Sequence, residues 1–156
     1  GWVDMLKPTK ILVPTDFSEF SDKALKQAID IASEYKAKVY VLHVVNERIS
    51  SALSDDYSDI SITEKDVLKY RKRMMDVAKG RLFKQIDKFP ESRDIKLIQR
   101  VVSGTPYEEI LREQEELGID LIVIASLGRT GIARFLIGGV ARNVLQGVKC
   151  PVLLTK

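Results

Sequence analysis

Two glycine-containing segments near the carboxyl end of the chain have the residue types and the spacing to bind an anion. Gly128 lies in a loop after the apolar run 121–124, and Gly138 with Gly139 opens a short segment that Gly147 closes. A glycine loop and a glycine-led helix start both expose backbone N–H groups, and the helix dipole adds positive potential there. This pattern favours the binding of nucleotide phosphates.

A carboxylate follows the first apolar run of the chain. Residues 10–14 form a short apolar segment that Pro14 ends, and Asp16 comes two positions later. Ligands of an open parallel sheet bind beyond the carboxyl ends of the strands, where the strand order reverses. If 10–14 and 121–124 are neighbouring strands at that point, Asp16 and the glycines face one crevice, and Asp16 accepts hydrogen bonds from ribose hydroxyls. Helix capping by Asp16 and tight turning or packing at the glycines are equally compatible with the sequence.

The two most common nucleotide-phosphate motifs are absent from the sequence. There is no Gly-x4-Gly-Lys-Ser/Thr loop and no Gly-x-Gly-x-x-Gly after the first apolar run. The glycines therefore belong to neither of those sites.

Apolar runs and helical periodicities alternate along the chain. They predict strands over 10–14, 39–45, 95–102, 121–124 and 151–154, and helices over 19–36, 64–89, 106–117 and 138–147. This alternation predicts an α/β fold, a single-domain open parallel five-stranded sheet with helices on both faces. Residues 1–9 are expected to be an N-terminal extension, in part an expression remnant, and residues 10–156 the domain.

Capping residues mark the starts of two predicted helices. Thr63 with Asp66 starts the long helix, and Thr105, Pro106 and Glu108 predict a full capping box at the next one.

Helical spacing also predicts which residues face the core. The inward residues of helix 19–36 are expected to be Ala24, Leu25, Ala28, Ile31, Ala32 and Tyr35, and those of helix 64–89 to be Val67, Met74, Ala78, Leu82, Ile86 and Phe89. Between these helices, beyond the second strand, residues 46–63 show neither period and predict a functional or mobile loop.

Composition limits the class of protein. The 156 residues are 45% apolar and 30% charged, and the net charge of +3 is too small to indicate a nucleic-acid-binding protein. The basic face of helix 64–89 is most simply a solvated surface. The single Cys150 excludes an intrachain disulfide and fits a reducing cytoplasm. No apolar run is long enough for a membrane helix, so we expect a cytoplasmic protein with no membrane partner.

His43 and Cys150 are the side chains most often used for metal binding or covalent chemistry. His43 lies in an apolar strand, where a packed or hydrogen-bonded structural role is the simpler interpretation, and Cys150 is expected to be buried and inert. No Cys, His and carboxylate cluster has metal-ligand spacing, so no protein-bound transition metal is expected. Mg²⁺ or Mn²⁺ carried with nucleotide phosphates is compatible with the sequence.

The chain resembles the universal stress protein family from about Lys10 to the carboxyl terminus. The matching segments, in order, are KILVPTDFS, VYVLHV, VSGTPYEEI, DLIVIASLGRTG and GGVARNVLQGVKCPVLLTK. The resemblance implies a sheet of order 3-2-1-4-5, which puts the reversal between the first and fourth strands. That position coincides with the crevice inferred from the residues.

The nucleotide-binding branch of that family carries Gly-x2-Gly-x9-Gly-Ser/Thr. The corresponding positions here are Ala125, Gly128, Gly138 and Gly139, so two of the four match. The methyl group of Ala125 is costly if the residue has a positive φ and harmless if φ is negative. Gly139 lacks the hydroxyl of the family residue, which removes one phosphate hydrogen bond worth roughly 0.5–1.5 kcal/mol.

The resemblance also implies which residues surround the ligand. Pro14, Thr15 and Asp16 would line the adenine and ribose side, with backbone of Val39 offered to the base. The phosphate and ribose side would comprise Ile124, Ala125, Gly128, Gly138, Gly139 and Val140. Arg129 would add charge to a phosphate, or it is a solvated loop residue.

The function implied is an ATP- or AMP-binding stress-response regulatory protein. Relatives pair through the last strand, so a homodimer through 151–154 with an unknown protein partner is expected. The alternative is a nucleotide-free dimer that acts through protein–protein contacts, which Ala125 and Gly139 favour. No general base or Walker-type lysine accompanies the glycines, so slow ATP hydrolysis is the most that an enzymatic role would involve.

Overall fold

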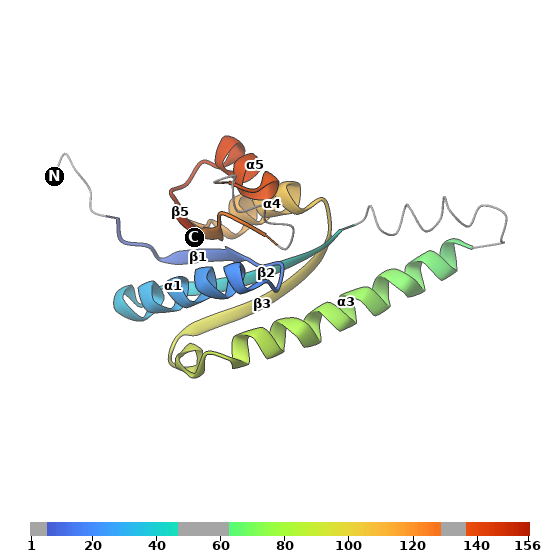
Figure 1. Cartoon of the computed structure of the whole chain (residues 1–156), viewed down its shortest axis with the longest axis horizontal. Helices are drawn as coiled ribbons and strands as arrows, with labels where there is room; N and C mark the ends of the chain where they lie inside the picture. Colours follow the sequence, from blue (N-terminus) through green and yellow to red (C-terminus); the bar gives the residue numbers. More distant parts are fainter. Residues whose placement is uncertain (1–5, 47–62, 129–136) are drawn as a thin grey trace.

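The computed structural model describes residues 6–46, 63–128 and 137–156, which form one parallel sheet with helices on both faces (Figure 1). The strands are β1 (Lys10–Pro14), β2 (Lys38–Asn46), β3 (Lys96–Gly104), β4 (Leu121–Ala125) and β5 (Val152–Thr155). The helices are α1 (Glu19–Tyr35), α3 (Glu64–Asp87), the 3-10 helix η1 (Pro90–Asp94), α4 (Pro106–Leu117) and α5 (Gly139–Gly147). The strand order β3-β2-β1-β4-β5 confirms the predicted α/β class and topology. Nearly all of the predicted loop 46–63 lies outside the described residues.

The central strand β1 is buried on both faces of the sheet. Successive residues of a strand point to opposite faces. Ile11 and Val13 belong to the core beneath α1 and α3, while Leu12 belongs to the core beneath α4 and α5. All three side chains are fully buried. Figure 1 shows the two helix pairs on opposite sides of the sheet.

Helix α1 packs on the sheet through a stripe that differs at three positions from the predicted one. The buried apolar residues are Ala24, Leu25, Ala28, Ile29 and Ala32. Ile29 was not predicted, and Ile31 is only partly buried. The prediction for Tyr35 was wrong, because this last residue of α1 lies directly before the left-handed C-cap and is 46% exposed.

Helix α3 begins with a capping box and packs on the sheet through its carboxyl half. The hydroxyl of Thr63 accepts from the Asp66 N–H at 3.2 Å, and the Asp66 carboxylate accepts from the Thr63 N–H at 3.1 Å. Its buried residues are Ala78, Leu82, Gln85 and Ile86, whereas Val67 and Met74, both predicted to face inward, are only partly buried. Figure 1 shows the amino-terminal half of α3 running away from the sheet.

Helix α4 begins at the predicted residue, but the predicted capping box is absent. Thr105 is the N-cap and Pro106 the first helical residue, yet the Thr105 side chain makes no capping hydrogen bond. The Glu108 carboxylate instead accepts a hydrogen bond from the Tyr107 hydroxyl at 3.3 Å. Gly118 ends the helix in the left-handed region at φ 67°, as its position in the sequence predicts.

Asp120 connects the amino ends of β1 and β4. Its carboxylate accepts hydrogen bonds from the backbone N–H groups of Thr9 and Lys10, each at 3.0 Å, and from the Thr9 hydroxyl. Desolvation by burial acts to raise the pKa of Asp120, but the hydrogen bonds from Thr9 and Lys10 outweigh it and hold the pKa below its ordinary value of 3.8. The ionised carboxylate therefore stabilises the pairing of two strands that are distant in the sequence.

We predict that Asp120→Asn lowers the free energy of unfolding by about 1 kcal/mol at pH 7, because it replaces charge-assisted hydrogen bonds by neutral ones. Since the folded pKa is depressed, the stabilisation is present above the ordinary value of 3.8 and is lost as the pH falls through the lower folded pKa. Urea unfolding from pH 7 to pH 2.5 should show wild type and variant converging at low pH. Asp30→Asn, in an exposed ion pair with Lys26, is the control and should change stability little. Parallel pH profiles for wild type and Asp120→Asn would contradict this role.

Candidate functional site

A crevice of about 640 Å³ lies at the carboxyl edge of the sheet, where β1 and β4 lie side by side. Its volume falls in the range of small-molecule sites. The crevice is lined by Pro14, Thr15, Asp16, Ser21, Leu42, His43, Val44, Pro106, Ile110, Ile124, Ala125, Ser126, Leu127, Gly128, Ile137, Gly138, Gly139, Val140, Ala141 and Arg142. The strand order reverses at this point, so the crevice occupies the position that the topology predicts.

The two features singled out by their chemistry, Asp16 and Gly128, are in close contact. One Asp16 carboxylate oxygen, Oδ1, accepts from the Ser18 N–H at 3.0 Å. The other, Oδ2, lies 2.7 Å from the place that a Cβ on Gly128 would occupy. Gly128 has no positive φ, so it is the close approach of the carboxylate, and not backbone conformation, that requires glycine here.

The start of α5 forms the anion-binding side of the crevice. No side chain in the described part of the chain caps this helix, so its first N–H groups lack the capping partner that such groups otherwise need. Gly138, the N-cap, has extended backbone and donates its own N–H to the Ser126 carbonyl. A Cβ on Gly138 would lie 3.3 Å from that carbonyl oxygen, whereas a Cβ on Gly139 would meet nothing within 4 Å. The space beside Gly139 is open for a ligand atom.

Ala125, which departs from the family motif, sits in an unstrained position. It ends β4, and the described non-glycine residues with positive φ are Phe17 and Lys36 only. Its side chain packs against the core beneath α1. The extra methyl group therefore does not distort the backbone at the crevice.

Thr15 lines the crevice, but its polar groups are already bonded within the protein. The buried hydroxyl of Thr15 donates to Gln85 Oε1 on α3 at 2.7 Å and lies 2.9 Å from the hydroxyl of Ser21. The same oxygen accepts from the Phe17 N–H at 3.0 Å. These bonds join the loop after β1 to both α1 and α3.

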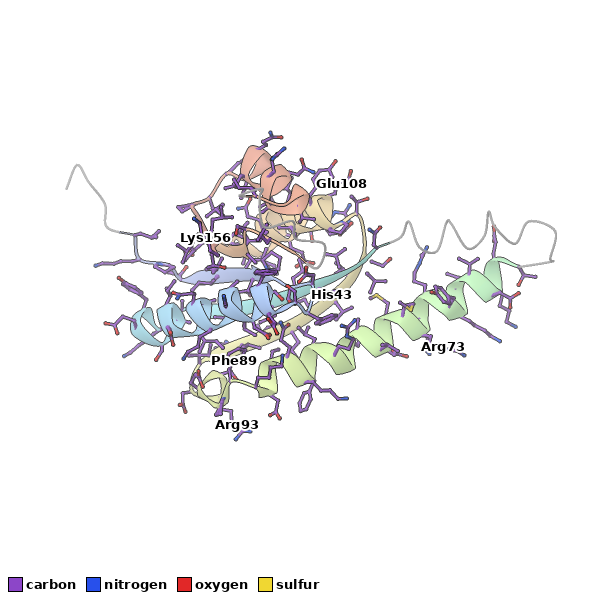
Figure 2. The ribbon with its side chains drawn as sticks, viewed as in Figure 1. His43, Arg73, Phe89, Arg93, Glu108 and Lys156 are labelled. Atoms are coloured by element: carbon purple, nitrogen blue, oxygen red, sulfur yellow. The ribbon has the colours of Figure 1, made fainter. Side chains whose placement is uncertain are left out.

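His43 has the hydrogen-bonded structural role that its strand position suggests, and it also lines the crevice. Its Nδ1 lies 2.8 Å from the Thr15 carbonyl oxygen, which can only accept, so Nδ1 carries a proton. The ring stacks on Phe17 with centroids 4.1 Å apart, and the Arg81 guanidinium lies 4.4 Å from the same Phe17 ring. Phe17 has φ 68°, an unfavourable value for an aromatic residue. Figure 2 shows His43 close to the start of α1.

The crevice includes most, but not all, of the residues expected around the ligand. Nine line it: Pro14, Thr15, Asp16, Ile124, Ala125, Gly128, Gly138, Gly139 and Val140. Arg129 lies outside the described residues. Val39 must be corrected, because it is fully buried beneath α1 and lies near the amino end of β2, at the opposite edge of the sheet. The crevice lies at the carboxyl edge of the sheet, and β2 ends there at Asn46. Leu42, His43 and Val44, near that end of β2, therefore line the crevice instead of Val39.

Several lining residues had no signal in the sequence. Pro106 and Ile110 reach the crevice from α4, which only the packing of that helix determines. Arg142 is the fourth residue of α5, one turn beyond the glycine pair. Ser126 is the exception, because its position directly after β4 could have indicated it from the sequence. Its side chain is buried in the structure.

Three other sequence expectations concern metals, cysteine chemistry and membranes. Within residues 6–46, 63–128 and 137–156, no group of three or more His, Cys, Asp and Glu side chains is placed to hold a metal ion. Burial raises the pKa of the half-buried Cys150 thiol, which disfavours the reactive thiolate. None of the described helices has the length and apolarity needed to span a membrane.

Comparison with known proteins identifies the family. Residues 8–156 match the Universal stress protein family. The chain belongs to this family. Universal stress protein MJ0531 of Methanocaldococcus jannaschii is 35% identical over 147 residues, covering 94% of this chain and 81% of that protein. Universal stress protein MJ0577 of the same organism is 33% identical over 153 residues, covering 94% of each chain.

Solved structures of family members share the architecture described above. The structure of MJ0577 superimposes with a TM-score of 0.82 at 30% identity and covers 97% of each chain. A universal stress protein from Archaeoglobus fulgidus, solved in complex with dAMP, has a TM-score of 0.62 at 21% identity and covers 97% of this chain and 100% of that one. At that identity the second comparison shows a shared fold.

We predict that Gly128→Ala costs about 1 kcal/mol of unfolding free energy, because the new methyl group displaces the Asp16 carboxylate from its hydrogen bond to Ser18. In an Asp16→Ala background the same substitution should be close to neutral. Gly139→Ala, where a Cβ meets nothing within 4 Å, is the matched control and should be neutral or slightly stabilising. Urea denaturation of the four variants measures the coupling, and an equal cost of Gly128→Ala in both backgrounds would contradict the Asp16–Gly128 contact.

Proposed function

We propose that this family member binds an adenine nucleotide in the crevice and acts as a stress-response regulatory protein. The observation that carries the proposal is one crevice lined both by the Asp16–Gly128 contact and by the uncapped start of α5. A carboxylate accepts hydrogen bonds from ribose hydroxyls, and free helix amides donate them to phosphate oxygens. The dAMP complex of the Archaeoglobus fulgidus relative supports the same class of ligand.

The base would bind between the carboxyl end of β2 and the start of α4. Leu42, Val44 and Ile110 supply apolar surface there, and backbone groups of the strand end supply polar contacts. This assignment replaces the contact with Val39. The proposed ligand remains ATP or AMP. A Mg²⁺ or Mn²⁺ ion would bind together with the nucleotide phosphates rather than at a metal site made by protein side chains.

The crevice favours binding over catalysis. Of the described lining residues, the titratable side chains are Asp16, His43 and Arg142. Asp16 accepts from the Ser18 N–H, and His43 Nδ1 donates to the Thr15 carbonyl. Both side chains are thus engaged in bonds within the protein rather than positioned as a general base, so slow ATP hydrolysis is the upper limit that we propose.

Isothermal titration calorimetry with ATP, ADP and AMP tests nucleotide binding. We expect binding by the wild type and a loss of at least tenfold in affinity, roughly, for Asp16→Ala, because a charged acceptor to the ribose is removed. Asp30→Ala removes an equal charge from an exposed ion pair on α1 and should bind like the wild type. No heat with folded wild-type protein at millimolar nucleotide would contradict the proposal and favour a nucleotide-free protein that acts through protein contacts. The observation that favours this second function is the glycine at position 139, which lacks the phosphate-binding hydroxyl of the family motif.

We further propose that the chain forms a homodimer through β5. Among the described strands, β5 is at the edge of the sheet and pairs only with β4, so one row of its backbone groups has no described strand beside it. Leu153 is 38% exposed at this edge. A second copy of β5 would pair with the backbone groups and cover this side chain.

Sedimentation equilibrium tests the dimer. The wild type should have twice the mass of the 17.6 kDa chain, and Leu153→Lys should raise the dissociation constant by about tenfold or more, because it buries a charge at the strand pair. Leu68→Lys changes an exposed leucine on α3 and should leave the dimer intact. A monomeric wild type at micromolar concentration would rule out the pairing.

A further inference from the structure

Arg142 is a basic side chain at the crevice without a partner among the described residues. It lines the crevice, and no other Lys or Arg does so among the described residues. Its guanidinium makes no hydrogen bond or ion pair recorded for residues 6–46, 63–128 and 137–156. By contrast, Arg100 makes a bidentate ion pair with Glu113, with N···O distances of 2.6 and 2.8 Å. An unpaired guanidinium beside a cavity is suited to bind an anion from outside the protein.

The position of Arg142 in its helix is electrostatically unfavourable without such an anion. The first turns of α1, α3 and α4 each carry acidic residues, which interact favourably with the helix dipole. The first turn of α5 carries none, and Arg142 is the fourth residue of the helix. A chain of phosphates that begins at the start of α5 would provide one anionic group for the free amides and another for this cation.

Helix geometry directs Arg142 toward the same place. The Cα–Cβ bonds of a helix tilt toward its amino terminus, so a long side chain at the fourth position covers the turn before it. That turn contains Gly139, where no side chain fills the adjacent space. The guanidinium has the length and the planar donor fork to bind two oxygens of a phosphate that lies beyond the one held by the amides.

We propose that Arg142 binds the outermost phosphate of a nucleoside polyphosphate and sets the preference of the crevice for ATP over AMP. The inference rests on the nucleotide-binding function proposed above. The amides of the first turn of α5, beginning with Gly139, hold the phosphate nearest the ribose, whereas the exposed Arg142 is available to a phosphate further out. Arg142 thereby supplies a phosphate contact in place of the hydroxyl that Gly139 lacks.

Calorimetric titration of wild type, Arg142→Gln and Arg142→Lys with ATP and AMP tests the assignment. Arg142→Gln should weaken ATP binding by about tenfold and AMP binding by less than about twofold, since only the polyphosphate loses a charge-assisted contact. Arg142→Lys should retain part of the ATP affinity because the charge remains. Arg93→Gln is the control. It removes the same charge from η1, where Arg93 forms an exposed ion pair with Asp87 of α3, distant from the crevice (Figure 2). This variant should bind both nucleotides like the wild type.

Thermal unfolding provides a second readout. Without nucleotide, Arg142→Gln should melt no lower than the wild type, because it removes an unfavourable charge from the start of α5. With ATP, its increase in melting temperature should be smaller than that of the wild type. A lower melting temperature without nucleotide would indicate a structural role and overturn the inference.

The outcomes separate this inference from the proposed function. If the wild type binds ATP and AMP and Arg142→Gln binds both equally well, the inference fails while nucleotide binding stands. An equal loss for ATP and AMP also overturns the assignment to an outermost phosphate. A folded wild type that binds no nucleotide overturns both.

Discussion

The pairing of β1 with β4 is the constraint on which the rest of the structure depends. Ile11 lies opposite Leu121 in the parallel register, although the two strands are separated by most of the chain. The Asp120 carboxylate holds the amino ends of both strands together through the backbone of Thr9 and Lys10. Because parallel strands held at one end reach the same edge of the sheet at the other, the loops that follow them are forced together. The crevice is a consequence of that register.

The β1 side of the crevice is held rigid by interactions directed away from the ligand. Thr15 uses its hydroxyl for Gln85 of α3, and His43 uses Nδ1 for the Thr15 carbonyl. Phe17 adopts a strained backbone angle while its ring contacts both His43 and Arg81. Strain of this kind persists only where surrounding contacts determine the conformation, and here those contacts come from β2 and α3. The position of Asp16 is thus set before any ligand arrives.

The opposite side of the crevice relies on backbone more than on side chains. Gly128 leaves space for the Asp16 carboxylate, and the Gly138 N–H donates a hydrogen bond to the Ser126 carbonyl. Gly139 leaves open space beside an uncapped helix start. Backbone amides recognise the charge and shape of a phosphate without distinguishing how many phosphates follow it. Discrimination between nucleotides therefore requires a side chain, and the basic one available among the described lining residues is Arg142.

Local pattern in the sequence was sufficient for the order of strands and helices along the chain, and hence for the α/β class, because strand and helix periodicity and glycine punctuation depend on residues close together in the chain. The meeting of Asp16 and Gly128 was only a conditional prediction, because it requires β1 and β4 to be neighbours, and that order was implied by the family resemblance. The position of the crevice along β2 required the tertiary structure. Val39 and His43 lie in the same apolar run, and only the pairing of β2 with β1 and β3 shows which end of that strand reaches the crevice.

Long-range packing likewise decided which side chains from other elements complete the site. Ile110 lines the crevice because α4 packs beside α5, and Thr15 is unavailable to a ligand because α3 places Gln85 against it. The capping box at Thr105 failed for a local reason, since the Glu108 carboxylate accepts a hydrogen bond from the adjacent Tyr107 hydroxyl instead of one from the helix start. The chain by itself determined the elements and the chemistry at the ends of β1 and β4. The tertiary structure decided which polar groups remain free for a ligand, because that depends on every neighbour that a side chain meets.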